Sequence, residues 1–412
     1  MKTQKITIFH QEFYYSGGAE LTLFETIDYL TSLGYTVECF APLISPSTCY
    51  PDIISKYRLK HFFPYFKFIP RELTIILAAL LAPLLVLRFR NTDLFYGANQ
   101  AGPYFAYIAS LIHKKPFIVY SPYPLGILYP RKIDQEFAKK SEKSELSSFG
   151  NFLINIIKPI LKSFDKRIIK SANALITESV HAKQLYIKIY NREVISCTPG
   201  TNIITQNEFN EIDKLNGSVT VNNLIINKPY ILLTNRHMPK KKFEYALEVA
   251  KNLSNTTFNN TTFVITGKYN EYTVTLKNLV NKYNLKNIIF TDYVTDSDIN
   301  LLYKNSAIYL YTAPEEDYGK GIAQAIGCGT PAIAWNNAGP ISIIKDNQTG
   351  FLIPLEDTNK MTQKIIYLLQ NPHIIKSMGQ NAIVDARQYL SKDIHNKVIL
   401  DTIKKILPND IY

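Results

Sequence analysis

A basic segment follows one apolar run and has residue types that suit a diphosphate. The run Tyr230–Thr234 reads as a buried strand, and Asn235 and Arg236 come directly after it. Lysines follow at 240–242, so four cations gather beyond the end of one strand. Open α/β sheets bind ligands at the carboxyl ends of their strands, and Arg and Lys contact phosphates through a planar fork and a point charge respectively. The alternative is a solvated basic loop.

A second segment combines carboxylates with the start of a glycine-rich helix. Its candidate ligand-binding residues are Glu315, Glu316, Asp317, Tyr318, Gly319 and Gln324. The Glu316 carboxylate can accept hydrogen bonds from sugar hydroxyls, and free backbone N–H groups near Gly319 can meet phosphate or sugar oxygens. Gln324 is expected further along the same helix. The alternative is a capped helix with exposed acids.

A third segment, Ser16–Glu20, lies between a strand-like run and an amphipathic run near the amino terminus. Gly17 and Gly18 would let a ligand approach the backbone closely, and the N–H groups of the following helix start favour an anion. An ordinary strand-to-helix turn is the alternative.

Strand-like and helix-like runs alternate along both halves of the chain, which predicts βαβ units and parallel sheets. The expected strands are 5–10, 36–40, 93–97, 116–121, 174–178 and 194–198, then 230–234, 262–267, 287–294, 307–312 and 331–335. We therefore predict an α/β protein of two Rossmann-like domains that face each other across a cleft, with helices at the C-terminal end.

The polar stretch around Asn216-Gly217 separates the two series of elements. We place a first domain at 1–205, with an apolar helix at 73–90, and a linker at 206–228. A second domain follows at 229–390, and a C-terminal helix at 391–412 is expected to pack back on the first domain.

Composition bounds the class of partner. The 412 residues carry a net charge of +12, which favours polyanions, yet no nucleic-acid-binding motif is present. The four cysteines form no CxxC pair, which fits a reducing compartment, and the start MKTQKITIFH has no signal-peptide core. We expect a cytoplasmic protein, peripheral at the inner face of the cell membrane, and no nucleic-acid partner.

One run, Leu73–Leu87, is apolar over 15 residues and is interrupted by Pro83. A spanning helix needs about 20 residues, so a membrane span is not expected. The run is either a buried helix of the first domain or a patch that enters a membrane interface from one side.

Together these motifs resemble the retaining GT-B glycosyltransferases of family 4, in a style similar to Alg2-type mannosyltransferases. The Gly17-Gly18-Ala19-Glu20 turn resembles the family's first-domain glycine loop. Arg236 and Lys241 look like its cation pair on the donor diphosphate, and the segment from Glu315 to Ala334 looks like its E-x7-E region.

Carried over by resemblance, Arg236, Lys241 and Glu316 are the catalytic residues, and Gly17, Gly18, Asn235, Glu315, Asp317, Tyr318, Gly319 and Gln324 contact the donor. Gln324 stands where the family has its second Glu, Lys242 where Gly or Asn is common, and Pro122 where many members carry a His. Tyr123 and His10 are candidates on the acceptor side.

The resemblance implies transfer of a hexose from GDP-mannose or a UDP-sugar to a glycan acceptor, with retention, without a metal and without a cofactor. A polyprenyl-phosphate-linked glycan at the cytoplasmic membrane face is the expected acceptor. Two alternatives stay open. One is a non-catalytic GT-B partner subunit or nucleotide-sugar sensor. The other is a nicotinamide oxidoreductase, but the sequence has no G-x-G-x-x-G motif after a predicted strand.

Overall fold

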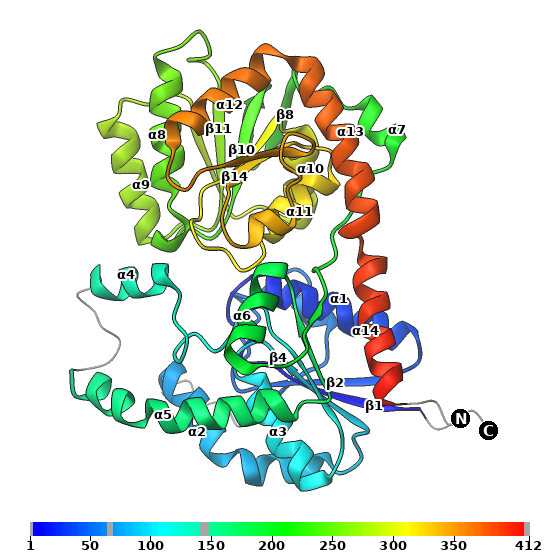
Figure 1. Cartoon of the computed structure of the whole chain (residues 1–412). Helices are drawn as coiled ribbons and strands as arrows, with labels where there is room; N and C mark the ends of the chain where they lie inside the picture. The colour runs from blue at the N-terminus through cyan, green and yellow to red at the C-terminus, as the bar shows by residue number, and fades with distance from the viewer. Residues whose placement is uncertain (1–2, 64–68, 141–147, 408–412) are drawn as a thin grey trace. The chain divides into compact units, whose positions relative to one another are not determined.

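The computed structural model describes residues 3–63, 69–140 and 148–407. The chain divides into two compact units (Figure 1). Unit 1 comprises Met1–Arg131, Ser141–Pro199 and His395–Tyr412, and unit 2 comprises Lys132–Lys140 and Gly200–Ile394.

Unit 1 is built on a seven-stranded sheet in which every strand pairs in parallel with its neighbours, in the order β3-β2-β1-β4-β5-β6-β7. Its strands are β1 (Lys5–Phe9), β2 (Thr36–Ala41), β3 (Leu59–His61), β4 (Leu94–Ala98), β5 (Phe117–Tyr120), β6 (Ala174–Thr177) and β7 (Ile195–Ser196). The apolar run of β1 explains its central place, because Ile6 and Ile8 are fully buried between β2 and β4.

Helices cover both faces of this sheet. They are α1 (Gly18–Ser32), α2 (Arg71–Leu85), α3 (Gly102–His113), α5 (Ser148–Ser171), α6 (Val180–Tyr190) and α14 (Lys392–Ile406). One buried cluster joins one sheet face to α2, α3, α5 and α6, and another joins the opposite face to α1 and α14. The second cluster includes Ile399 and Ile403, so the end of the described chain completes the core of unit 1.

Unit 2 contains a six-stranded parallel sheet in the order β12-β11-β10-β13-β14-β15. Its strands are β10 (Tyr230–Thr234), β11 (Thr262–Thr266), β12 (Ile288–Asp292), β13 (Ile308–Tyr311), β14 (Ala332–Trp335) and β15 (Gly350–Ile353). The helices are α4 (Lys132–Lys140), α7 (Gln206–Glu211), α8 (Phe243–Ser254), α9 (Glu271–Lys282), α10 (Asp296–Asn305), α11 (Lys320–Gly327), α12 (Thr358–Gln370) and α13 (Pro372–Tyr389). The apolar sides of α7 to α13 fill one core on each face of the sheet.

The two parallel-sheet units confirm the predicted fold class. One detail of the expectation is wrong, since residues 206–228 are not an irregular linker. They contain α7 and a hairpin of β8 (Ser218–Val221) and β9 (Leu224–Asn227), and unit 2 includes them. The polar composition of this stretch predicts an irregular segment. Val219 and Val221, however, alternate with exposed polar residues, which is the pattern of a half-buried strand.

Candidate functional site

The order of the strands in unit 2 creates a ligand-binding position. The chain runs outward from β10 to β11 and β12 on one side, and from β13 to β14 and β15 on the other. The loops after β10 and β13 therefore diverge at the carboxyl edge of the sheet, and such a switch point is where open α/β sheets bind ligands. These two loops are 235–242 and 312–319, the basic and the acidic segments that the sequence singled out.

Three side chains meet at this switch point. The Lys241 ammonium forms an ion pair with Oε2 of Glu316, and the Tyr311 hydroxyl donates to the same carboxylate oxygen. Lys241 Nζ also lies 3.4 Å from the Tyr311 hydroxyl. The side chains of Lys241 and Glu316 are 18% and 16% exposed, so the charged pair is largely shielded yet remains open to a ligand.

Burial and the neighbouring Glu316 carboxylate raise the pKa of Tyr311 well above its ordinary value, although a hydrogen bond with the Asn235 side chain acts in the opposite sense. Tyr311 therefore stays protonated at neutral pH and remains a hydrogen-bond donor. A carboxylate that accepts two hydrogen bonds on one oxygen is fixed in orientation. The arrangement can present an ammonium to an anion and a carboxylate to hydroxyl groups within the same small space.

The backbone behind Glu316 is also held tightly. The Gly339 N–H donates to the Glu316 carbonyl at 2.8 Å. A Cβ at Gly339 would lie 2.4 Å from the carbonyl oxygen of Tyr318, so only glycine allows this approach. Gly319 precedes α11 with φ 104°, in the left-handed region that favours glycine. Thus two glycines set the shape of the loop that carries the carboxylate.

The loop after β10 has an anchor of its own. His237 is 2% exposed, and its Nδ1 lies 2.8 Å from Thr273 Oγ1. Burial lowers the pKa of His237, so this ring is neutral at neutral pH and adds no charge to the basic loop. Lys242 adopts φ 49° and ψ 48°, which explains why Gly or Asn suits that position.

The remaining predicted donor residues take different positions. Arg236 has an exposed side chain, while Asn235 joins the cluster through Tyr311. Tyr318 is buried, Asp317 is half-buried, and Gln324 is half-buried on α11. The structure thus brings Lys241, Glu316 and Asn235 together at one phenol, and Arg236 lies next to Asn235 in the chain.

Helix α4 connects both loops, a role that the sequence did not suggest. The backbone N–H of Ile133 donates to the Glu315 carboxylate at 2.9 Å, and the Lys240 ammonium donates to Asp134 at 2.6 Å. Glu315 and Lys240 are the immediate neighbours of Glu316 and Lys241. The first turn of α4 therefore fixes the two loops relative to each other.

The predicted residues of unit 1 lie at the carboxyl edge of the first sheet. His10 follows β1, is 1% exposed and has its Nε2 3.4 Å from Glu20. Gly17 precedes α1 and Gly18 begins it. Tyr123 follows β5, and its carbonyl accepts a hydrogen bond from Ser121 at 2.9 Å. This edge is the corresponding switch point of unit 1, between β1 and β4.

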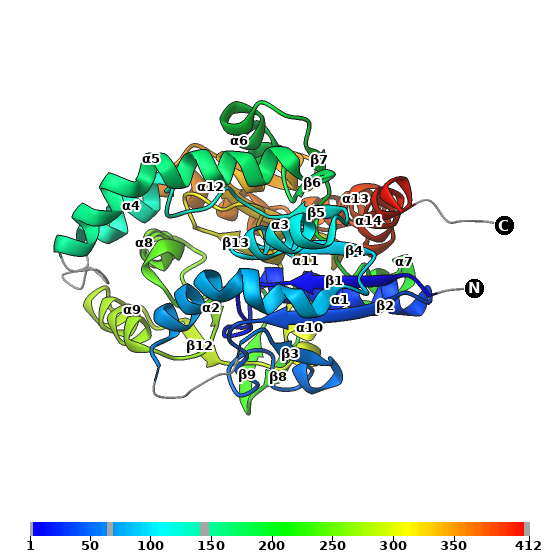
Figure 2. The same ribbon diagram turned by 90° about the horizontal axis from the view of Figure 1, so that it is seen from below.

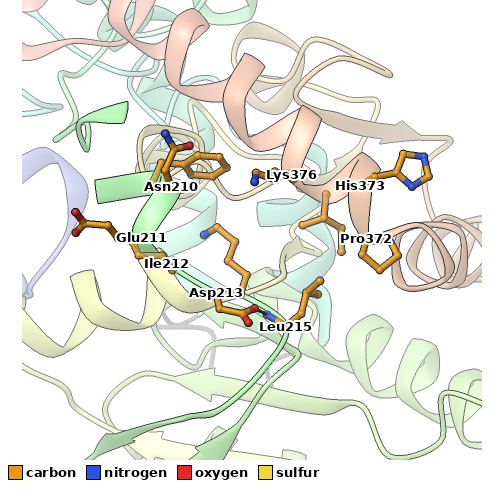
Figure 3. A pocket seen from close by; sticks show the side chains of 11 residues that line it. Asn210, Glu211, Ile212, Asp213, Leu215, Pro372, His373 and Lys376 are labelled. Atoms are coloured by element: carbon orange, nitrogen blue, oxygen red, sulfur yellow. Dashed lines mark hydrogen bonds between the residues drawn. The ribbon is translucent and has the colours of Figure 1, made fainter. Parts of the chain in front are cut away.

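A separate cavity of about 410 Å³ in unit 2 includes none of the predicted residues (Figure 3). It is lined by α7, the following loop and the start of α13. Lys214 borders it but directs its ammonium to the carbonyls of Lys304 and Cys328 and to Thr330 Oγ1, the last at 2.8 Å. Lys214 thus caps the C-terminal ends of α10 and α11, which is a structural role.

The two Rossmann-like units define a GT-B protein. A solved structure of Alr3699/HepE from Anabaena, in complex with UDP and glucose, aligns with a TM-score of 0.72 over 98% of this chain and 100% of that chain, at 15% identity. Residues 220–385 match the family model described as Glycosyl transferases group 1. The matched segment contains Lys241, Tyr311 and Glu316, so the described cluster lies within the part of the chain that is similar to group 1 glycosyltransferases.

Curated relatives match over limited stretches. Trehalose synthase from Pyrococcus horikoshii is 27% identical over 132 residues, which are 32% of this chain and 31% of that protein. The alpha-1,3/1,6-mannosyltransferase ALG2 from Dictyostelium discoideum is 27% identical over 205 residues, 43% of this chain and 48% of that protein. The chain thus covers less than half the length of these relatives. The predicted likeness to Alg2-type proteins is confirmed at low identity.

Proposed function

We propose that this protein is a glycosyltransferase that moves a hexose from a nucleotide sugar to a glycan acceptor. The observation that carries the proposal is the meeting of Lys241 and Glu316 at the switch point of the group 1 domain. Such a pair offers a cation to a diphosphate and an acceptor to sugar hydroxyls. We further propose that Arg236 joins Lys241 on the diphosphate and that Gln324 contacts the ribose.

In the proposed reaction the bond between the anomeric carbon and the diphosphate oxygen breaks. Negative charge grows on the leaving diphosphate, and Arg236 and Lys241 stabilise it in the role that a divalent metal would otherwise fill. One such preorganised donor is worth about 3–4 kcal/mol in the transition state. The oxygen of the acceptor hydroxyl forms the new bond to the anomeric carbon, its proton passes to the departing diphosphate oxygen, and the anomeric configuration is retained.

The donor is GDP-mannose or a UDP-sugar, and the structure of HepE with UDP and glucose supports the latter class by analogy of fold. The acceptor is a glycan carried on a polyprenyl phosphate at the inner face of the cell membrane. We assign His10 and Tyr123 of unit 1 to acceptor recognition, and Gly17 and Gly18 to contact with the donor. The net charge of +12 supports a phosphorylated, membrane-borne substrate.

The direct test replaces each proposed phosphate ligand. A thermal-shift panel of GDP- and UDP-sugars first identifies the donor, since a ligand that binds only the folded state raises the melting temperature. Arg236→Ala and Lys241→Ala should then each lower the transfer rate by about 10²–10³-fold. The control is Lys268→Ala, which removes an exposed cation from the loop after β11. Undiminished transfer in both variants would refute the proposed site.

A second candidate is a non-catalytic GT-B partner subunit or nucleotide-sugar sensor. It is favoured by Gln324, an amide where the resembling enzymes carry a carboxylate. The purified chain would then bind the donor without consuming it. Release of free nucleotide from the donor, with or without acceptor, excludes this candidate.

A further inference from the structure

Helix α2 carries a line of large apolar side chains that is exposed to solvent and, on its opposite face, a line of small side chains that is buried. Thr74, Ala78 and Ala82 are at most 1% exposed and face the sheet of unit 1. The opposite face carries large apolar residues with exposed fractions between 44% and 71%, namely Leu73, Ile76, Leu80 and Leu84. Leu87, just beyond the helix, is 55% exposed and continues the same face.

This exposed face, the α2 stripe (Leu73, Ile76, Leu80, Leu84 and Leu87), is unusual for a helix at a water-exposed surface. Such a helix normally carries polar residues opposite its buried face, and an apolar helix is normally covered on all sides. The core of unit 1 takes Ala78 and Ala82, with Leu85 and Val86 at the end of the segment, and does not include the stripe. The stripe therefore calls for an apolar partner outside the unit.

Helix α5 adds positive charge on the same side of the sheet. Both helices contribute to one buried cluster, and α3 packs between them (Figure 2). Residues 158–171 contain five cations and one acid, and that acid, Asp165, accepts a hydrogen bond from Tyr190 at 2.7 Å. Lys166, Arg167 and Lys170 are exposed, and Ile160 on the same helix is 71% exposed. The side of unit 1 that carries the stripe is thus both apolar and basic.

We propose that the α2 stripe enters the surface of an anionic lipid bilayer, while the exposed cations of α5 contact lipid phosphates. Apolar side chains beside Lys and Arg are the combination that holds a helix in the interface plane. A second copy of the chain fits less well, because a two-fold contact through this side would set the two basic α5 helices against each other. No helix in the described part of the chain combines the length and apolar character that crossing a bilayer requires.

The proposal deepens the proposed function, since it names the membrane surface on which the acceptor is found. It does not depend on catalysis. The test is sedimentation of the full chain with sucrose-loaded vesicles, made of phosphatidylcholine alone or mixed with phosphatidylglycerol. The wild-type chain should sediment with the mixed vesicles, at least tenfold more than with phosphatidylcholine alone.

Two sets of variants separate the apolar and the charged contributions. Leu80→Ser combined with Leu84→Ser should lower the partition coefficient at least tenfold, whereas Ile225→Ser combined with Val384→Ser, which alters exposed apolar residues of unit 2, should leave it unchanged. Replacement of Lys166, Arg167 and Lys170 by Gln should also lower it. The charge-matched control replaces Lys282, Lys286 and Lys360, which are exposed in unit 2, by Gln.

Three results would overturn the proposal. The first is vesicle binding that Leu80→Ser with Leu84→Ser leaves intact while the melting temperature is unchanged. The second is a dimer, seen by light scattering, that these substitutions dissociate without any vesicle binding by the wild type. The third is binding that does not fall when salt is raised from about 0.1 M to about 0.5 M, since surface charge contacts are screened at that ionic strength. Vesicle binding by Lys241→Ala should match the wild type, so loss of donor binding and loss of membrane binding are distinguishable.

Discussion

Tyr311→Phe tests the most specific contact of the site. The substitution removes one hydroxyl and keeps the ring that fills the space between β13 and the two loops. In the wild type this hydroxyl donates to Glu316 Oε2 and lies 3.4 Å from Lys241 Nζ. Without this hydroxyl, Glu316 keeps its ion pair with Lys241 but loses the second hydrogen bond that fixes the orientation of its carboxylate. We therefore expect the carboxylate to change orientation whenever the flexible Lys241 side chain moves.

The magnitude follows from the kind of bond that is lost. A hydrogen bond to a charged group contributes about 1.5–3 kcal/mol, and a single charged donor remains on the same oxygen, so the lower part of this range applies. About 1.5–2 kcal/mol corresponds to a loss of about 10–30-fold in kcat/KM for the donor. Tyr311 is 3% exposed, so the substitution leaves its packing unchanged and affects stability by about 1 kcal/mol.

Tyr309→Phe is the matched control. Tyr309 lies two residues earlier on β13, is fully buried, and bonds through its hydroxyl to Thr234 Oγ1 at 2.9 Å. Removal of the Tyr309 hydroxyl should lower the melting temperature about as much as Tyr311→Phe does, but it should not lower the transfer rate comparably. Steady-state transfer with varied donor measures both variants. Equal losses of kcat/KM in the two variants, or none in Tyr311→Phe, would show that the phenol does not orient the carboxylate.

Two further predictions concern α4 and the buried lysine. Asp134→Asn removes a partly shielded ion pair with Lys240, so the KM for the donor should rise about two- to fivefold, whereas Asp134→Glu keeps the charge and should leave the KM unchanged. A lower kcat at unchanged KM would contradict this. Burial lowers the pKa of Lys214 from 10.5 to about 7. From about pH 7 to about pH 8 the unfolded chain holds a proton that part of the folded population lacks, so Lys214 should make stability rise with pH by up to about 1.4 kcal/mol per unit, and urea unfolding of Lys214→Met should lack this contribution. At higher pH the buried cysteines, whose pKa values are raised by burial, act in the opposite sense.

The sequence was sufficient for the elements that carry the site. The apolar runs predict β10 and β13 to within one residue of their observed bounds, because each has a strong local pattern. Because neighbouring strands are parallel, the loops that follow them lie at the same carboxyl edge of the sheet. Lys241 and Glu316 form their ion pair at this edge. Because side chains alternate along a strand, Tyr309 and Tyr311 of β13 point to the same face, and this spacing is the sequence signal for the phenol at the site.

The contacts of α4 had no comparable signal. Ile133 and Glu315 are separated by 182 positions, and nothing in the composition of either segment specifies the other. The sequence therefore predicts residues 132–140 as part of the first domain, whereas the structure groups them with unit 2. The apolar run at Leu73–Leu87 left two interpretations open for a similar reason. Periodicity identifies a helix, but only the packed structure tells that its small residues face the core.

Unit 1 is built from segments near both ends of the chain, which has a consequence for folding during synthesis. Strand β1 leaves the ribosome early, yet the core around it is completed by Ile399 and Ile403 of α14. At a translation rate of about 5–20 residues per second, nearly 400 residues separate these events by about 20–80 s. Until then the nascent first unit has α1 on this sheet face but lacks α14, while the contiguous segment 200–394 can already collapse. A chaperone that shields apolar strands during this interval would act on unit 1 first.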